Sequence, residues 1–190
     1  MKQWLVSAFA VCMLLAFGSA SAQMTTLDPQ SIDAYLNSLP KVEALGRKLE
    51  NQGKGDAWLK EVTPEIGQNF NPHQQGVALL SQEEPSAYQE LTQITRQHSF
   101  TSAERWAEVG DRIILAYGAL KAESESPEMF AMAAEFDSVN PQMLQMLPPE
   151  IRQQVEQAML IVRAFAQVSD SDKQQVRPFL SRIDTVLSQY

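Results

Sequence analysis

Apolar and polar residues follow a helical period along almost the whole chain after residue 27. Residues three or four positions apart share one face of an α-helix, so this spacing predicts amphipathic helices. The clearest stripe consists of Trp106, Val109, Ile113, Tyr117 and Leu120. A neighbouring stripe of small residues consists of Ala103, Ala107, Gly110 and Gly118. Small side chains let another helix approach closely, so we expect this to be the central helix of the fold.

Prolines mark the expected helix boundaries, because nine of the ten fall where a helix would begin or break. Proline suits the first turn of a helix, where its missing N–H is no loss. Four prolines directly follow a good N-cap residue: Asp28-Pro29, Asn71-Pro72, Ser126-Pro127 and Asn140-Pro141. We expect helices to begin at Pro29, at Pro85 and at Pro148-Pro149. We expect Pro40 to break the first helix and Pro178 to kink or restart the last.

The stretches between these signals predict turns, a loop and further caps. The segment after Pro40 should end at Asn51-Gln52-Gly53, and a short helix should run from Asp56 to Pro64. Residues 64–76 have the least periodic sequence and are predicted to be a connecting loop with a solvated His73. Two capping boxes are expected, Thr101 to Glu104 and Ser169 to Asp172.

Two further features of the pattern bear on the packing of the helices. Glu108 and Arg112 are spaced for an ion pair on the outside of the central helix. The helix after Pro148-Pro149 should turn five residues inward: Ile151, Val155, Met159, Val162 and Ala166.

The fold class follows from this periodicity. The chain has no sustained alternation of apolar and polar residues and no Asn-Gly or Asp-Gly hairpin turn. We therefore predict an all-α, single-domain irregular bundle of about six to eight short-to-medium helices within residues 23–190.

The first 22 residues have the three zones of a secretory signal peptide. Lys2 supplies a basic start, residues 4–17 form an almost wholly apolar run, and Ala20-Ser21-Ala22 is a small-residue cleavage signature. The apolar run is 14 residues long, whereas a membrane-spanning helix needs roughly 20. We expect cleavage between Ala22 and Gln23 and a mature chain, residues 23–190, that is periplasmic or secreted.

Composition then narrows the classes of partner. The one cysteine, Cys12, lies inside the signal, so the mature chain has no thiol for a disulfide, a metal or catalysis. Cleavage removes Lys2 and no acidic residue, which changes the net charge from −8 to −9. An acidic surface of this kind argues against nucleic acid and against docking on anionic lipid. No later apolar run approaches the length of a membrane span.

Motifs for catalysis and for cofactors are scarce. His73 and His98 have no histidine partner three or four positions away, and H-E-x-x-H and G-x-S-x-G do not occur. His98 near a helix C-terminus is explained by the helix dipole. We therefore expect a non-enzymatic protein with no cofactor. The alternative is a hydrolase whose site is assembled from separated residues, with His98 as the base.

Methionine is the one residue type whose enrichment suggests a binding site. The candidate partner-binding residues are Met129, Met132, Phe136, Met143 and Met146. Methionine is flexible and polarizable, so these residues suit an adaptable apolar surface for a protein, a peptide or a small apolar ligand. We expect the partner to be an envelope protein or peptide. The alternative is a Cu(I) carrier, because each Met-x-x-Met pair places two soft sulfur ligands on one face.

Overall fold

The computed structural model describes residues 27–54, 70–131 and 146–188 of the chain. These residues form seven α-helices and one 3-10 helix, and they contain no strand. The elements in chain order are α1 (Pro29–Asn51), α3 (Pro72–Glu83), α4 (Pro85–Gln97), α5 (Ala103–Glu125), α8 (Pro149–Ala166), α9 (Asp170–Val176), the 3-10 helix η1 (Arg177–Phe179) and α10 (Leu180–Leu187). The prediction of an all-α, single-domain bundle is confirmed. None of the described helices combines the length and the apolar character needed to span a bilayer.

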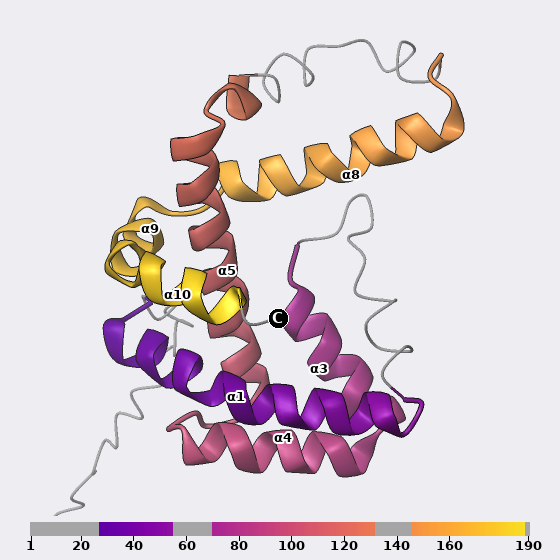
Figure 1. Cartoon of the computed structure of the whole chain (residues 1–190), viewed down its shortest axis with the longest axis vertical. Coiled ribbons are helices and arrows are strands. Elements are labelled where there is room, and N and C mark those ends of the chain that lie inside the picture. The colour runs from indigo at the N-terminus through magenta and orange to yellow at the C-terminus, as the bar shows by residue number, and fades with distance from the viewer. Residues whose placement is uncertain (1–26, 55–69, 132–145, 189–190) are drawn as a thin grey trace, which may run out of the picture.

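Helix α5 lies at the centre of the bundle, as its apolar stripe predicted. It contacts α1, α3, α4, α8 and α9, and Trp106, Val109 and Ile113 are buried along it. Figure 1 shows α1, α3 and α4 gathered around one half of α5, while α8 meets the other half. The small-residue stripe is confirmed as a place of close approach. A Cβ on Gly118 would lie 2.5 Å from the ring of Phe165 in α8.

Helix α1 continues through Pro40, so the predicted break at this residue is wrong. Proline removes one backbone hydrogen bond and crowds the carbonyl four residues earlier, at a cost of about 3 kcal/mol. The apolar face of α1 is buried on both sides of Pro40, with Leu36 before it and Leu45 after it. Burial of one continuous face against α4 and α5 therefore offsets the local cost and keeps the helix in one piece.

Side-chain caps fix several helix starts. Asp28 caps α1 by accepting a hydrogen bond from the Ser31 backbone N–H at 3.0 Å, as predicted. Ser169 caps α9 in the same way, with 3.1 Å from its Oγ to the backbone nitrogen of Asp172. The cap of α5 is Ser102 and not Thr101, since Ser102 Oγ accepts from the Arg105 backbone N–H. The predicted start was one residue early because both residues carry a hydroxyl.

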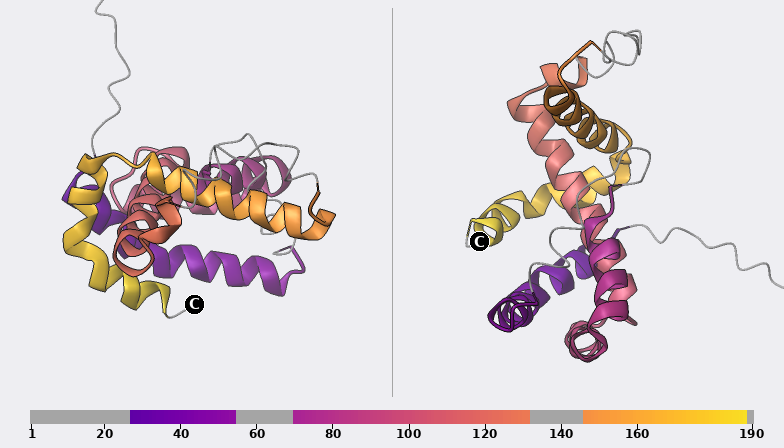
Figure 2. Two further views of the ribbon diagram at one scale, coloured as in Figure 1. Left: turned by 90° about the horizontal axis from the view of Figure 1, so that it is seen from above. Right: turned by 90° about the vertical axis from the view of Figure 1, so that its right-hand side faces the viewer.

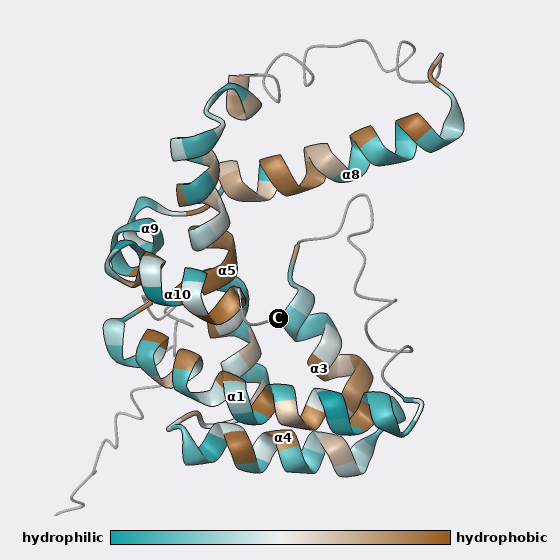
Figure 3. Cartoon of the chain, viewed as in Figure 1, coloured by the Kyte–Doolittle hydropathy of each residue, from teal (hydrophilic) through white to brown (hydrophobic). Residues whose placement is uncertain are grey.

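Helix α8 lies at the opposite end of α5 from α1, α3 and α4 in the right-hand view of Figure 2, and apolar residues recur along its length in Figure 3. It does not turn all five expected residues inward. Val162 is buried, but Ile151 is 45 % exposed and Ala166 is exposed, so the prediction is wrong for these two residues. Phe165, which packs on Gly118, lies near the C-terminal end of α8, whereas the exposed Ile151 lies near its start.

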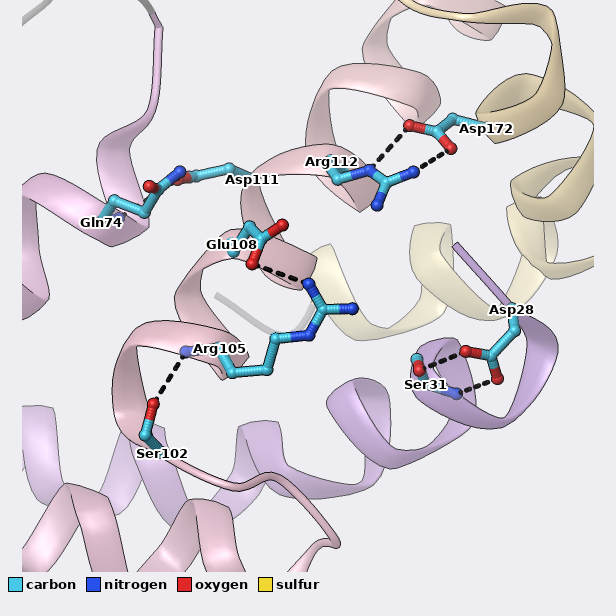
Figure 4. A network of polar contacts seen from close by, with 9 residues as sticks. All are labelled: Asp28, Ser31, Gln74, Ser102, Arg105, Glu108, Asp111, Arg112 and Asp172. Carbon is cyan, nitrogen blue, oxygen red and sulfur yellow. Dashed lines mark hydrogen bonds and ion pairs between the residues drawn. The ribbon is translucent and has the colours of Figure 1, made fainter. Parts of the chain in front are cut away.

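The ion pairs differ from the predicted one. Arg112 does not pair with Glu108; it donates to both carboxylate oxygens of Asp172 in α9, at 2.9 and 2.6 Å. Glu108 instead pairs with Arg105, one turn earlier on the same helix (Figure 4). A bidentate pair with a buried carboxylate is stronger than an exposed pair along one helix, which explains the choice. The last helix restarts at Pro178, as predicted: the 3-10 helix η1, which contains Pro178, separates α9 from α10.

Candidate ligand-binding cavity

A cavity of about 320 Å³ lies between α1, α3, α4 and α5, and its walls are almost wholly apolar. We call it the four-helix cavity. Its lining consists of Leu39, Val42, Glu43, Leu45, Gly46 and Leu49 from α1, Pro72, His73, Gly76, Val77 and Leu80 from α3, Leu91 from α4 and Trp106 from α5. Ligand pockets in proteins start at roughly this size, about 300 Å³. The cavity is therefore large enough for a small molecule or part of one.

A chain of partly buried hydrogen bonds runs through His73, which lines the cavity. His73 Nδ1 lies 2.8 Å from a carboxylate oxygen of Asp111, and His73 Nε2 lies 2.8 Å from the hydroxyl of Tyr35. An ionised carboxylate only accepts hydrogen bonds, so Nδ1 carries the proton and Nε2 accepts from the Tyr35 hydroxyl. We call Asp111, His73 and Tyr35 the polar relay. It links α5, α3 and α1 through side chains alone.

Asp111 also caps α3 from the neighbouring helix. Asn71 occupies the N-cap position, but its side chain makes no capping hydrogen bond. The carboxylate of Asp111 instead accepts from the backbone N–H groups of His73 and Gln74, at 2.7 and 3.1 Å, and from the Gln74 side-chain amide at 3.0 Å. A carboxylate at this place meets the unpaired N–H groups and the positive end of the helix dipole. Figure 4 shows Gln74 and Asp111 pointing toward each other from the two helices.

Trp106 completes the wall beside the relay. Its ring lies 5.4 Å from the ring of Tyr35 and 5.5 Å from that of His73, measured between centroids. Its indole N–H donates to Ser38 Oγ at 2.8 Å, and the Ser38 hydroxyl donates to the Tyr35 carbonyl at 2.6 Å. The ring nitrogen of Trp106 and the two ring nitrogens of His73 thus all make hydrogen bonds within the protein. What these residues offer to the cavity is hydrocarbon surface.

The relay has the order carboxylate, imidazole, hydroxyl that activates a nucleophile in many hydrolases. Its geometry here favours a structural role. Tyr35 is only 2 % exposed, so its hydroxyl is closed to a substrate, and both nitrogens of His73 already have partners. The relay therefore holds three helices together at the side of the cavity.

The prediction that His73 is a solvated loop residue is wrong. His73 is the second residue of α3, and its side chain is 21 % exposed. The predicted loop over 64–76 is wrong for residues 72–76, which begin this helix, while 64–69 lie outside the described residues. The pair Asn71-Pro72 was the signal for the helix start. A second signal was Asp111, a carboxylate that follows the small residue Gly110 on the central helix.

His98 stands at the C-terminal cap of α4, as predicted. Burial, together with the positive charge of Lys41, holds the pKa of His98 below its ordinary value of 6.5. Its Nε2 is buried and has no hydrogen-bond partner among the described residues. A hydrolase with His98 as base requires a carboxylate and a hydroxyl beside it, and the part of the chain that the structure describes supplies neither to Nε2.

Two of the five candidate partner-binding residues fall within the described chain. Met129 is half-buried in a helical turn just after α5, and Met146 is 84 % exposed immediately before α8. Met132, Phe136 and Met143 lie outside the described residues. The structure therefore does not show these five residues brought together. Sequence reasoning missed the four-helix cavity, which is formed by other residues altogether.

No group of three or more His, Asp or Glu side chains within residues 27–54, 70–131 and 146–188 is placed to hold a metal ion. Comparisons with known proteins add no family. No family model matches the chain, and neither a curated protein nor a solved structure matches it. Inference about function rests on the geometry of the residues themselves.

Proposed function

We propose that this protein is an exported, non-enzymatic binding protein that holds a small apolar ligand in the four-helix cavity. The observation that carries the proposal is the nature of the walls: a half-open space of about 320 Å³ is lined almost wholly by apolar surface from four helices. Apolar surface around a half-open space is in contact with water, and an apolar guest that covers it gains about 25 cal/mol for each Å² of apolar surface buried. A ligand that fills this space therefore stabilises the bundle as well.

The absence of an accessible reacting group at this cavity supports binding over catalysis. Of the described residues, His73 is the one imidazole on its wall, and both of its nitrogens are occupied by Asp111 and Tyr35. The carboxylate on the lining, Glu43, is paired with Arg47. Recognition inside the cavity thus depends on shape and on apolar contact.

The experiment is a titration of the mature chain, residues 23–190, with the apolar fluorophore N-phenyl-1-naphthylamine. A Trp58→Phe background leaves Trp106 as the one tryptophan of the mature chain. Since Trp106 lines the cavity, we expect energy transfer from its indole to the bound fluorophore, with one molecule bound per chain. Failure of the fluorophore to bind would overturn the proposed function.

A matched pair of variants locates the bound fluorophore. Val77→Phe adds volume at a buried residue on the cavity wall, and we expect it to weaken binding about tenfold or more, or about 1.4 kcal/mol. Ala78→Phe adds the same ring at the next residue of α3, which is exposed, and should leave the affinity unchanged. Equal affinities of the two variants would place the fluorophore elsewhere. A third variant, Trp58→Ser, replaces a large apolar side chain of the same chain by a small one. If the fluorophore bound only to this variant, a side chain of the protein itself would fill the cavity, which would also contradict the proposal.

Export is the second part of the proposal. The apolar run of residues 4–17 and the Ala20-Ser21-Ala22 sequence support cleavage after Ala22. The described fold begins at Leu27, which is buried, so cleavage after Ala22 removes none of the described residues. Mass spectrometry of the protein from an envelope fraction should give a chain that begins at Gln23. A chain that retains Met1 would contradict export with cleavage.

The methionine-rich segment supports a second candidate function, the binding of an envelope protein or peptide. The observation in its favour is Met146, whose exposure leaves a large apolar side chain in solvent. Met129→Leu with Met146→Leu keeps volume and removes sulfur, so partner capture should survive the change. The Cu(I)-carrier alternative predicts the opposite result, a loss of Cu(I) retention in competition with a Cu(I) chelator.

A further inference from the structure

Gly46 lies in the C-terminal half of α1, and no packing contact there requires glycine. Glycine inside a helix is about 1 kcal/mol less favourable than alanine. A Cβ built on Gly46 meets nothing within 4 Å, whereas one on Gly110 or Gly118 would clash with an aromatic ring. The glycines of α5 therefore allow close contact between helices. The missing side chain at Gly46 leaves open space.

That space belongs to the four-helix cavity. Gly46 lines it, between Val42 four residues earlier and Leu49 three residues later on the same face of α1. The lining of α1 runs from Leu39 to Leu49, a distance of about 15 Å at 1.5 Å per residue. The cavity is therefore elongated along the helix, and at Gly46, as at Gly76 of α3, its wall is backbone without a side chain.

The chemistry of the walls selects the occupant. The side chains along α1 and α3 that face the cavity are mainly aliphatic, with Leu39, Leu49 and Leu80 among them. The N–H groups of His73 and Trp106 already donate to Asp111 and Ser38. A polar group in the part of the ligand inside the cavity would therefore have no hydrogen-bond partner. An elongated space with aliphatic walls fits an unbranched hydrocarbon chain better than a polar or branched molecule.

We propose that the four-helix cavity takes one unbranched aliphatic chain, which lies across the bare backbone of Gly46, and that this glycine sets the length of chain accepted. The inference rests on the proposed binding function and names the class of ligand. A side chain at residue 46 would occupy the place of the ligand's carbon atoms.

The experiment measures binding of 1-alkanols from butanol to decanol to the mature chain by isothermal calorimetry. Each methylene buried should raise the affinity about fourfold, since burial is worth about 0.8 kcal/mol. The rise should stop once the chain fills the cavity. Gly46→Leu should move this limit to shorter alcohols, by roughly two to three methylenes. Gly46→Ala adds one methyl group and should move it by one at most.

A second variant tests the same idea in the opposite direction. Val42→Ala enlarges the lining one turn before Gly46, so its limit should move to longer alcohols. If the affinity of Gly46→Leu depended on alcohol length as that of the natural chain does, this inference would be overturned. In that case, continued binding of N-phenyl-1-naphthylamine would leave the proposed function standing. Loss of fluorophore binding by the natural chain would overturn the function itself, so the two failures are distinguishable.

Discussion

The ring of Tyr35 in α1 lies directly on the backbone of Gly110 in α5. A Cβ on Gly110 would stand 2.6 Å from Tyr35 Cε2 and 3.1 Å from His73 Cδ2. The Tyr35 ring has no room to retreat, because it is buried and its hydroxyl is bonded to His73. The contact sets the spacing of α1 and α5, and with it the width of the bundle beside the four-helix cavity.

We therefore expect Gly110→Ala to destabilise the protein. Overpacking of a tight core costs about 1–3 kcal/mol, and the higher helix propensity of alanine returns about 1 kcal/mol. The net loss should be up to about 2 kcal/mol in the free energy of unfolding, measured with urea. Gly46→Ala is the matched control. It makes the same change in a helix interior with open space around the new methyl group, so it should stabilise by about 0.5–1 kcal/mol. Two changes of equal sign would contradict the packing described for Gly110.

Asp111 provides a prediction about the polar relay. Its carboxylate accepts four hydrogen bonds from His73 and Gln74. Asp111→Asn replaces one accepting oxygen by an NH₂ group that faces N–H donors, so at least one buried donor loses its partner. We expect a loss of about 2–3 kcal/mol in unfolding free energy and faster amide exchange at His73 and Gln74.

The control for this change is Asp170→Asn. Asp170 has a side chain that is 98 % exposed and pairs with Lys173 on the surface of α9. An exposed pair contributes little, so the variant should stay within about 0.5 kcal/mol of the natural chain. Unfolding free energies that fall equally in the two variants would show that the loss reflects net charge and not the capping of α3 by Asp111.

The helices were predictable because their signals are local. Asp28-Pro29 and Pro85 mark helix starts within a few residues, and the spacing of Trp106, Val109 and Ile113 gives the buried face of α5 without knowledge of its neighbours. Pro40 shows where local rules fail. Proline destabilises one turn of helix, but the burial of Leu36 and Leu45 against other helices outweighs this cost. Those other helices are distant in the sequence, so the residues around Pro40 do not reveal them.

The cavity and the relay depend on contacts between residues far apart in the chain. Tyr35 and Asp111 each lie 38 residues from His73. No spacing rule connects them, so His73 was placed in solvent. The same limit explains Arg112, for which Glu108 is the nearest partner along the helix while the true partner, Asp172, is 60 residues away. The sequence alone shows that Asp111 and Arg112 are charged residues in a central helix, and it does not show which groups pair with them.

The pair of Arg112 and Asp172 gives the third prediction. It joins α9 to α5 with two short hydrogen bonds, and the Asp172 side chain is largely buried. Arg112→Met leaves that carboxylate without its main partner, so we expect a loss of about 2–4 kcal/mol. Asp172→Asn should cost less, because an amide is cheaper to bury than a charge.

A double-mutant cycle separates this pair from the other contacts of Arg112. If the bidentate pair accounts for the loss, the double variant should be more stable than the sum of the two single changes predicts, by about 1–3 kcal/mol. Additive losses, measured by urea unfolding, would mean that Arg112 acts through other neighbours.

His98 predicts how stability depends on pH. Burial, with a smaller contribution from Lys41, lowers the pKa of His98 in the folded protein, while the unfolded chain keeps the ordinary value of 6.5. As the pH falls below that value, the unfolded chain takes up a proton that the folded chain does not, so the unfolded state gains stability. The loss stops when the pH has also passed the lowered pKa of the folded state. The natural chain should therefore lose more stability than His98→Asn between pH 7.5 and pH 5, measured by urea unfolding at about half-unit steps. Carboxylates titrate in both proteins and cancel in the difference. Parallel curves for the two proteins would mean that His98 accepts its proton in the folded state without penalty, and that its buried Nε2 finds a partner on protonation.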